Sequence, residues 1–453
     1  MASNQQQAGT QLVLIAKKRK EMSSAERVQP YQRKLYLKAK QGKEYKSYIL
    51  YDKIFLHYIL AESWKRVKAN GGSAGVDGQT SEVIEAGGVE KFLKTLSEEL
   101  RQQDYQPSAA KRVWIPKSNG EKRPLGIPTI KDRVAQMACK LVIEPVFEAD
   151  FEDSPYGSRP KRPAHGAVAK IKEHLKAGKT EVYDAGLSKY FDTIPHGKLM
   201  IALRERMAGR RVLSLIEKWL KAPVSEDGQF SGGEKDKEGA PQGGVIPPLP
   251  SNLYLHLLDR IVNSSKSIFK EAGIVMVRYA DDFVLMGKTL GGAALAKLKD
   301  LLGRMGLTIN EKKSGQLNAR ETPFNFLGFV FRFGQGHKDP QGPKFWNVKP
   351  NEKPNKKIRE KIGEALKKMG HYKPQDMVGE LNAILRGWLN YFDVKGVSYP
   401  FVAKRALDHY LRHRLWRYFN RKSQRKSRLY RKQAFEILVS KFRLIDPIKF
   451  SAT

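Results

Sequence analysis

The sequence is poor in the features that mark secreted, disulfide-bonded or membrane-spanning proteins. Its 453 residues contain a single cysteine, Cys139, which excludes an internal disulfide and a cysteine-based zinc site. No apolar run reaches the length of a membrane span, and the N-terminus lacks the apolar segment of a signal peptide. These absences favour a protein of a reducing compartment that does not span a membrane. We expect a cytoplasmic location of bacterial type, associated with the nucleoid or a ribonucleoprotein.

Acidic residues are scarce relative to basic ones. Asp and Glu number 47 against 83 Lys and Arg, so the formal net charge is +36 at pH 7. A solvated basic surface alone rarely reaches this excess, and a polyanion such as nucleic acid is the expected partner. The length allows two or three domains with a sizeable core.

The most distinctive segment is residues 274–286, I-V-M-V-R-Y-A-D-D-F-V-L-M, in which two apolar arms flank a short polar centre. This pattern predicts a tight β-hairpin with both arms buried. Asp281 and Asp282 would lie together at its tip, where like charge and desolvation are costly. A bound Mg²⁺ would remove that cost, because this hard cation prefers carboxylate oxygens. The alternative is a solvated turn that carries two acids.

A second hairpin is predicted from strands over 112–116 and 122–127, joined by a turn at 118–120. It brings together Lys117, Lys122 and Arg123. Such a cluster can grip a triphosphate, and an ordinary charged hairpin tip is the alternative.

The rest of the chain alternates between amphipathic helices and short strands. A single helix-like segment is expected over 47–68. Further helices are expected over 89–101, 131–149, 165–177, 198–208, 212–220 and 290–305. Strands are expected over 182–191, 307–313 and 324–331. A Gly/Pro-rich stretch, 333–354, predicts a linker, and helices follow over 356–369, 377–391, 402–418 and 431–442.

The C-terminal helical region is strongly basic. From Lys404 to Lys432 there are twelve Lys or Arg residues and one acid, Asp408. Aromatic residues interleave with these arginines, a pattern typical of surfaces that stack on unpaired RNA bases. A solvated charged face is the alternative. The residues that we predict to contact RNA are Arg412, Arg414, Arg417, Arg421 and Lys422.

Several segments, in order, resemble the successive sequence blocks of a group II intron-encoded reverse transcriptase. They are residues 105–129, 156–160, 188–196, 241–244, 279–282, 307–313 and 324–331. The helical segment L-N-A-I-L-R-G-W-L-N-Y-F, residues 381–392, resembles the maturase, or thumb, domain of the same family. The resemblance covers residues 50–435, and no Cys/His-rich endonuclease segment follows. The chain therefore resembles an endonuclease-lacking member.

This resemblance implies an α+β, right-hand polymerase fold. Fingers and palm with antiparallel sheet would be followed by an α-helical thumb/maturase domain. We expect a basic N-terminal extension over 1–70, fingers and palm over 71–340, the thumb over 350–432 and a short tail over 433–453.

The family also implies catalysis by two Mg²⁺ ions, with Asp281 and Asp282 as catalytic, metal-binding residues. The implied substrate-binding residues have separate roles. Lys117 and Arg123 would bind dNTP phosphates, and Phe191 would lie under the sugar. Gln242 and Gly243 would line the floor near the incoming nucleotide.

One expected metal ligand is replaced. Family members place an aspartate five residues before the position of Phe191, and that position is Gly186. Asp184 is the substitute to consider, because it lies two residues earlier on the same face of the expected strand. Its displacement of about 6–7 Å is too large for the same metal without a register shift. Metal affinity should therefore fall sharply.

Other departures from the family pattern lie in the same region: Ser158, Gly166, Gly197, Pro247 and Pro250. An interior proline at position 250 would break a helix at a cost of about 3 kcal/mol. A domesticated maturase, a decaying copy and an altered sequence are all compatible with this set.

Two functions remain open at the level of sequence. The first is an RNA-directed DNA polymerase that also assists intron splicing and mobility. Its partners would be structured intron RNA, an RNA template, a DNA primer and dNTPs, and palms of this kind can form a homodimer. The second is a polymerase-deficient maturase that acts as an RNA-binding splicing factor. A relative recruited to host defence or CRISPR adaptation is a third option, disfavoured by the lack of an appended domain.

Overall fold

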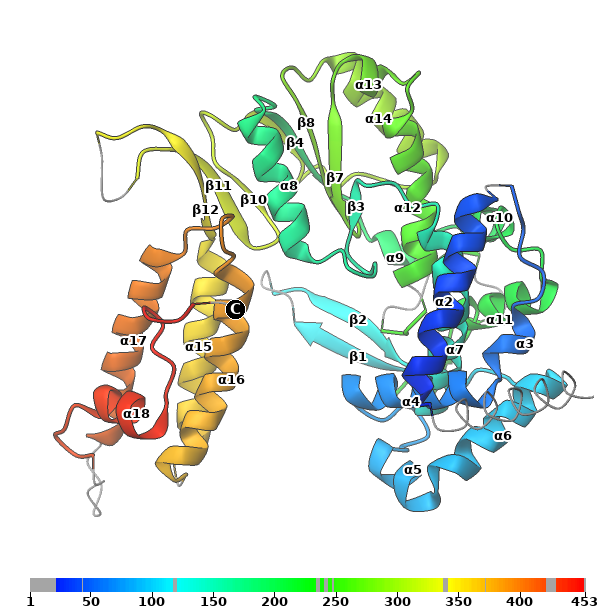
Figure 1. The fold of residues 1–453 in the computed structure, drawn as a ribbon, viewed down its shortest axis with the longest axis horizontal. Coiled ribbons are helices and arrows are strands. Elements are labelled where there is room, and N and C mark those ends of the chain that lie inside the picture. Colours follow the sequence, from blue (N-terminus) through cyan, green and yellow to red (C-terminus); the bar gives the residue numbers. More distant parts are fainter. Residues whose placement is uncertain are drawn as a thin grey trace, which may run out of the picture.

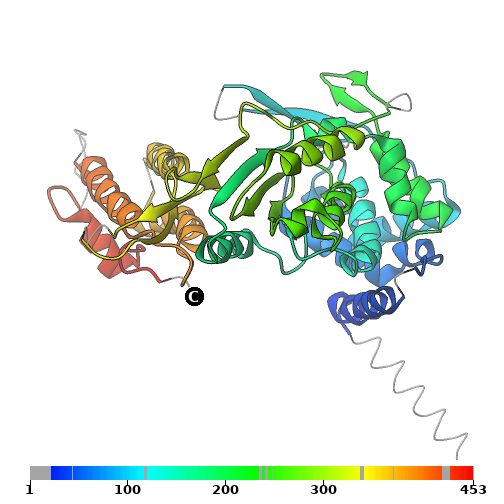
Figure 2. The same ribbon diagram turned by 90° about the horizontal axis from the view of Figure 1, so that it is seen from above.

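The structure of the chain is a computed structural model. It describes residues 22–42, 44–116, 120–233, 237–239, 243–246, 248–336, 341–370, 372–420 and 429–451. The fold mixes helices and sheets. A lobe of C-terminal helices lies at one end of the molecule in both views, with a central sheet between it and the N-terminal helices (Figures 1 and 2).

The central sheet has five strands in the order β3-β7-β8-β4-β9. Their bounds are β3 (Pro155–Tyr156), β4 (Glu181–Gly186), β7 (Val275–Tyr279), β8 (Asp282–Gly287) and β9 (Gly315–Asn318). All neighbouring pairs are antiparallel except β3 with β7. The predicted hairpin is confirmed, because β7 and β8 are joined through Ala280 and Asp281 and both arms are largely buried.

Side chains of β8 alternate between two hydrophobic cores, as the pleat of a strand requires. Phe283 and Leu285 enter the first core, whereas Val284 and Met286 enter the second. Helices α12 (Pro248–Asn263), α13 (Ile268–Glu271) and α14 (Gly292–Arg304) contribute to the first core. Helix α8 (Ala164–Lys176) contributes to the second.

The N-terminal helices complete the first core around α7 (Ile130–Glu148). They are α2 (Ser24–Gln41), α3 (Tyr51–Ile54), α4 (His57–Asn70), α5 (Ser81–Gly87) and α6 (Val89–Gln102), followed later by α10 (His196–Arg204) and α11 (Arg210–Leu220). The single helix expected over 47–68 is two helices with a break at 55–56. Thr129 caps the N-terminus of helix α7, because its Oγ1 accepts the Asp132 N–H at 3.1 Å and satisfies one free backbone donor.

A second sheet, which we call the outer sheet, has the strand order β2-β1-β5-β6. Its strands are β1 (Ala110–Pro116), β2 (Lys122–Ile127), β5 (Val224–Glu226) and β6 (Gln229–Ser231). The predicted strands over 112–116 and 122–127 are confirmed. The β5–β6 hairpin extends this sheet, because β5 pairs in parallel with β1.

The C-terminal lobe combines a small sheet with four helices. Its elements are β10 (Phe324–Phe326), β11 (Phe329–Gly334), β12 (Phe345–Pro350), α15 (Glu352–Lys368), α16 (Pro374–Phe392), α17 (Phe401–Phe419) and α18 (Ala434–Phe442). The single strand expected over 324–331 is wrong, because Leu327 and Gly328 adopt φ of 50° and 81° and reverse the chain. The linker expected over 333–354 is also wrong, since β12 pairs with β11 there.

The C-terminal lobe is joined to the central sheet through a shared core and buried polar contacts. The buried Lys172 on α8 donates from Nζ to the carbonyls of Val397 at 2.7 Å and Gly396 at 3.1 Å. These carbonyls belong to the connection between α16 and α17. Beyond residue 433, Phe435 and Leu438 are buried in the same core.

Three local expectations differ from the structure. Residues 307–313 form no strand and contribute only an isolated bridge from Ile309 to Leu187. The strand expected over 182–191 ends at Gly186, and Phe191 lies in the short helix α9 (Tyr190–Thr193). Pro250 does not break a helix, because α12 begins at Pro248 and the first turn has no intrahelical partner for its N–H groups.

In the part of the chain that the structure describes, no helix combines the length and apolarity needed to cross a membrane.

Candidate active site

The β7–β8 turn places the two adjacent aspartates. Asp281 is the second turn residue, and Asp282 is the first residue of β8. Asp282 pairs with Tyr279 on one side and with Gly186 of β4 on the other. Ala280 has a φ of 55°, so the backbone reverses within two residues. Asp281 is half-buried, whereas Asp282 remains accessible to solvent.

Gly186 lies directly beside the Asp282 carboxylate. A Cβ atom at position 186 would lie 3.0 Å from Asp282 Oδ1. The backbone of Gly186 is held on both sides, by Ser314 Oγ at 3.3 Å and by the Asn310 N–H at 2.9 Å. A side chain at this position would therefore point toward Asp282, and glycine places no side chain there.

Asp184 lies on the same face of β4 but one pleat repeat further along. It pairs with Val284, whereas Gly186 pairs with Asp282. Burial, and then the charge of Asp282, raise the pKa of Asp184 to about 6. The charges of Asp184 and Asp282 therefore repel each other, although Asp184 does not occupy the position next to Asp282.

The pKa values of the adjacent aspartates are also raised. Although the Asp282 residue is exposed as a whole, partial desolvation of its carboxylate is the largest cause that raises its pKa to about 6, and the charge of Asp281 is the next. Lys313 and Arg123 oppose this shift. Burial raises the pKa of Asp281, against a backbone hydrogen bond and nearby cations. Excess negative charge in a partly desolvated site is the condition that a divalent cation relieves.

The donor set is incomplete for a metal centre. Among the residues that the structure describes, no group of three or more Asp, Glu, His or Cys side chains is arranged to hold an ion. The oxygen ligands of Asp281 and Asp282 fit Mg²⁺ in type. The family resemblance leads us to expect a third carboxylate beside Asp282, where Gly186 stands. The two remaining carboxylates would hold such a cation weakly.

The predicted substrate-binding residues are partly gathered around this site. The charge of Arg123 on β2 offsets part of the rise in the pKa values of both aspartates, so Arg123 lies near them. Phe191 is half-buried on α9, with its ring centroid 5.3 Å from that of Tyr190. Lys117 and Gln242 lie outside the described residues.

Gly243 makes a close backbone contact with the outer sheet. Its φ is 115°, and a Cβ atom there would lie 2.4 Å from the carbonyl oxygen of Gly126 on β2. Only glycine permits this conformation and this approach. The segment before α12 is thereby fixed against the hairpin that carries Arg123.

A buried ion pair lies beneath the turn, and the sequence pattern did not predict it. Arg278 is fully buried and bonds Asp259 of α12 through Nε at 3.0 Å and through Nη2. Its Nη1 donates to the carbonyl of Ala280 and to Asn252 Oδ1, each at 2.9 Å. Asn252 in turn donates to the Gly157 carbonyl at 2.8 Å. The residue before Asp281 is therefore held from α12, and the available signal was a lone arginine inside an apolar strand.

The predicted RNA-contacting arginines of α17 differ in their surroundings. Arg412 is engaged by Asp408 at 2.8 Å and by Glu436, and its guanidinium lies 4.1 Å from the Phe435 ring centroid. Arg417 is exposed, and Arg414 is half-buried. Arg421 and Lys422 lie outside the described residues.

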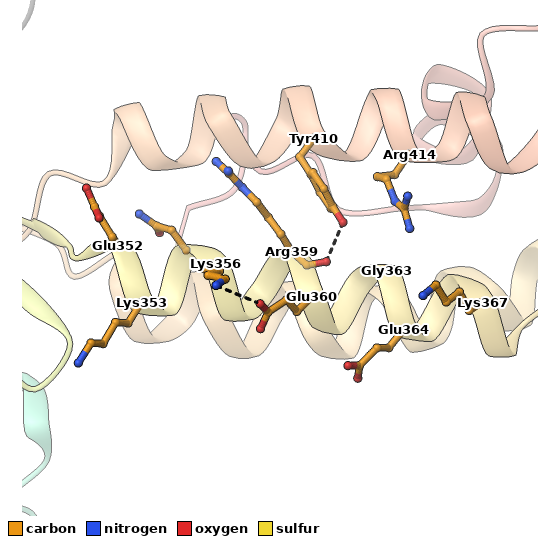
Figure 3. Close-up of a pocket in the computed structure, with 11 residues that line it drawn as sticks. Glu352, Lys353, Lys356, Arg359, Glu360, Gly363, Glu364, Lys367, Tyr410 and Arg414 are labelled. Atoms are coloured by element: carbon orange, nitrogen blue, oxygen red, sulfur yellow. Dashed lines mark hydrogen bonds and ion pairs between the residues drawn. The ribbon is translucent and has the colours of Figure 1, made fainter. Parts of the chain in front are cut away.

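Arg414 faces a groove of about 930 Å³ between α15 and α17 (Figure 3). The charged side chains that line it are Lys353, Lys356, Arg359, Lys367, Arg414, Glu352, Glu360 and Glu364. Tyr410 Oη donates to the Arg359 carbonyl at 2.8 Å and ties the two helices together. Tyr410 and Arg414 pack against α15 at Gly363. A Cβ atom there would lie only 3.2 Å from Arg414 Nη2 and would crowd this contact. The groove is open, polar and basic on balance, which suits a phosphate backbone.

Comparisons with known proteins agree with this arrangement. Residues 115–331 match the family described as reverse transcriptase (RNA-dependent DNA polymerase), and residues 355–435 match the group II intron, maturase-specific domain. Protein YkfC of Escherichia coli (strain K12) is 38% identical over 244 residues, covering 47% of this chain and 63% of the relative. Group II intron-encoded protein LtrA of Lactococcus lactis subsp. cremoris is 35% identical over 181 residues, covering 40% of this chain and 30% of the relative. In both cases the chain spans less than two thirds of the relative's length.

The Arg278–Asp259 pair yields a stability prediction. Arg278→Met leaves the fully buried Asp259 charge without its partner, and the free energy of unfolding should fall by about 3–5 kcal/mol. The double variant Arg278→Met/Asp259→Leu removes both charges and should recover part of that loss. Thermal melts monitored by circular dichroism measure both. A double variant less stable than the single one would contradict this account of the pair.

Asp184 yields a pH prediction. Its pKa of about 6 lies above the ordinary value of 3.8, so the folded state favours the neutral acid. The neutral Asp184 carboxyl therefore stabilises the folded protein at low pH, and this stabilisation is lost as the pH rises through 6. Asp184→Asn should therefore raise the melting temperature at pH 8 without metal by roughly 2 °C or more, with no gain at pH 4. The exposed Asp104→Asn is the control. An equal gain at both pH values would exclude the carboxylate as its source.

Proposed function

Because the chain belongs to the group II intron reverse transcriptase and maturase family, we propose that it binds structured intron RNA and assists its splicing. In this proposal the outer sheet and N-terminal helices act as fingers, the central sheet as palm and the C-terminal lobe as thumb. The polymerase framework is retained, but RNA-directed DNA synthesis is weak. The observation that supports weak DNA synthesis is Gly186 beside Asp282, where a metal ligand is expected.

The residues around the turn have distinct roles in this proposal. Asp281 and Asp282 hold the cation. Arg278 fixes the position of the turn relative to α12, because it bonds both Asp259 of α12 and the Ala280 carbonyl. Arg123 pairs with the phosphates of a dNTP, which its place on the outer sheet near both aspartates supports. When bound, Mg²⁺ would activate the primer hydroxyl and neutralise the leaving pyrophosphate. An RNA template, a DNA primer and dNTPs are the corresponding substrates.

RNA binding is supported by a different part of the chain. The groove between α15 and α17 carries five basic and three acidic side chains, and Arg417 is exposed on the neighbouring surface of α17. The net charge of +36 favours a polyanionic partner over the whole molecule. None of these features depends on Gly186, so RNA binding is retained when polymerisation is impaired.

The polymerase part of the proposal is tested by restoring the missing ligand. Gly186→Asp should increase Mg²⁺-dependent primer extension on an RNA template. Even an outer-shell partner of a metal site is worth about 10–100-fold, so the gain should be at least of that order. Gly186→Asp/Asp281→Asn is the matched control and should extend no better than the unaltered chain.

Other outcomes of this experiment are equally informative. Equal extension by the unaltered chain and Gly186→Asp would mean that Asp184 completes the site and that the assignment of Gly186 is wrong. No extension by either protein, with RNA still bound, would place the defect in the other departures around positions 247 and 250.

The RNA-binding part is tested by removing charge from α17. Arg414→Gln/Arg417→Gln should weaken binding of a group II intron RNA. The slope of log K against log salt should fall by about 0.7–0.9 for each lost phosphate contact. Lys91→Gln/Lys94→Gln removes two exposed charges from α6, in the opposite lobe, and controls for net charge. An unchanged salt slope in the α17 variant would remove this helix from the RNA surface.

A further inference from the structure

A cavity of about 400 Å³ lies between helices α10, α12 and α14. Its apolar wall is formed by Ile201 of α10, Leu253, Leu257 and Ile261 of α12, and Leu301 of α14. The three α12 positions are four residues apart and therefore share one face of the helix. A mostly apolar cavity of this volume is typical of a small-molecule site.

Two side chains of this wall are unusually exposed. Ile201 is 62% exposed and Leu257 is 45% exposed. Because both line the same cavity, they form one apolar surface open to solvent and are not two scattered side chains. Clustered exposure of this kind marks a place where another molecule binds.

Hydrogen bonds between the helices fix the shape of the cavity. Tyr254 Oη on α12 donates to the carbonyl of Met305, at the C-terminal end of α14. Lys198 Nζ on α10 donates to the carbonyl of Arg304, in the last turn of α14. All three helices are thus joined at the end of α14, and the cavity is preformed, as is usual for small-molecule sites.

The cavity is separate from the acidic turn. Phe283 and Leu285 of β8 point into the core that α12 and α14 line, whereas Asp282 lies on the alternate face of the strand. The cavity lies on the α12 side of the central sheet, so a molecule bound there would not meet Asp282.

His256 gives the cavity one buried polar group. It lines the cavity with 6% of its surface exposed, and its Nδ1 has no hydrogen-bond partner in the described part of the chain. Burial and then nearby arginines, Arg260 foremost, lower the pKa of His256 to about 3, so the ring is neutral and carries one proton. A buried N–H group without an acceptor is rare, which places this proton on Nε2. Since Nδ1 is shielded from solvent, Nε2 is also the nitrogen that a ligand in the cavity can reach.

The charged side chains around the cavity favour an anion. Among the described residues that line it, one is acidic, Glu205, and three are basic: Lys198, Arg260 and Arg304. Arg304 is paired with Asp300 at 3.0 Å. Arg260 and Glu205 lie 3.4 Å apart with both side chains more than half exposed, and such a pair contributes little stability. Arg260 can therefore exchange Glu205 for a ligand, and it lies near the donor on His256.

We propose that this cavity binds an organic carboxylate with an apolar chain. The chain lies against Ile201 and Leu257, and the carboxylate accepts the Nε2–H of His256 and pairs with Arg260. This site goes beyond the proposed function, because the residues that line it are distinct from those of the acidic turn and of the groove between α15 and α17.

The first test measures binding of straight-chain carboxylates to the full chain by isothermal titration calorimetry. Hexanoate, octanoate, decanoate and dodecanoate are compared below their micelle concentrations. Each methylene that enters the cavity should tighten Kd about fourfold, the affinity equivalent of burying one methylene, until the cavity is filled. Decanol should bind more weakly than decanoate, and decyltrimethylammonium should not bind.

Two variants separate the carboxylate from the chain. His256→Phe keeps an aromatic ring beside Phe151 but loses the N–H. Its Kd for decanoate should rise by about 10–100-fold, the range for a hydrogen bond to a charged group, with a smaller change for decanol. The melting temperature should not fall, because Nδ1 of His256 has no partner to lose in the described part of the chain. Ile201→Gln/Leu257→Gln should instead remove the dependence of Kd on chain length.

His409→Phe on α17 and Val83→Gln on α5 are the matched controls, because both positions are exposed and lie outside the cavity. Both should bind decanoate as the unaltered chain does. The site is overturned if decanoate does not bind, if decyltrimethylammonium binds equally well, or if His256→Phe leaves Kd unchanged. The proposed function stands in each of these cases, since primer extension and RNA binding are measured separately. If decanoate does not bind and Ile201→Gln/Leu257→Gln lowers self-association in sedimentation, the apolar surface belongs to a second copy of the chain.

Discussion

The register between β4 and β8 is the constraint on which the rest of the structure depends. It sets Gly186 opposite Asp282 and Asp184 opposite Val284, and therefore decides which side chains meet at the acidic turn. The same register sorts the side chains of both strands between two cores. A slip of one residue would move Asp184 and Asp282 to the other face of the sheet, toward the core that α12 lines. The site and the core packing are thus specified by one set of backbone hydrogen bonds.

This arrangement separates the stability of the fold from the chemistry of the site. Gly186 is held through its backbone by Ser314 and Asn310, so the sheet does not depend on a side chain at this position. A third carboxylate beside Asp282 would add negative charge to a place where pKa values are already raised. Functional acids of this kind are held at a cost in stability. Glycine at this position adds no such charge.

The sequence was most informative where periodicity and turn chemistry agree. The hairpin of β7 and β8, the strands β1 and β2 and the long helices follow from such patterns. It was misleading where a positive φ at a non-glycine residue reverses the chain, as at Leu327, which turned one expected strand into two. It also missed contacts between distant segments. The Arg278–Asp259 pair and the parallel pairing of β5 with β1 depend on tertiary register, which local propensity does not encode.

The contact between Gly243 and Gly126 joins main chain to main chain, with no side chain between them. Side chains can change rotamer to absorb a displacement, but two backbones in contact have no such freedom. The inner end of the outer sheet therefore has a fixed distance from the segment that leads into α12. Any movement of the outer sheet relative to this segment must therefore come from the parts of the strands that lie away from Gly126.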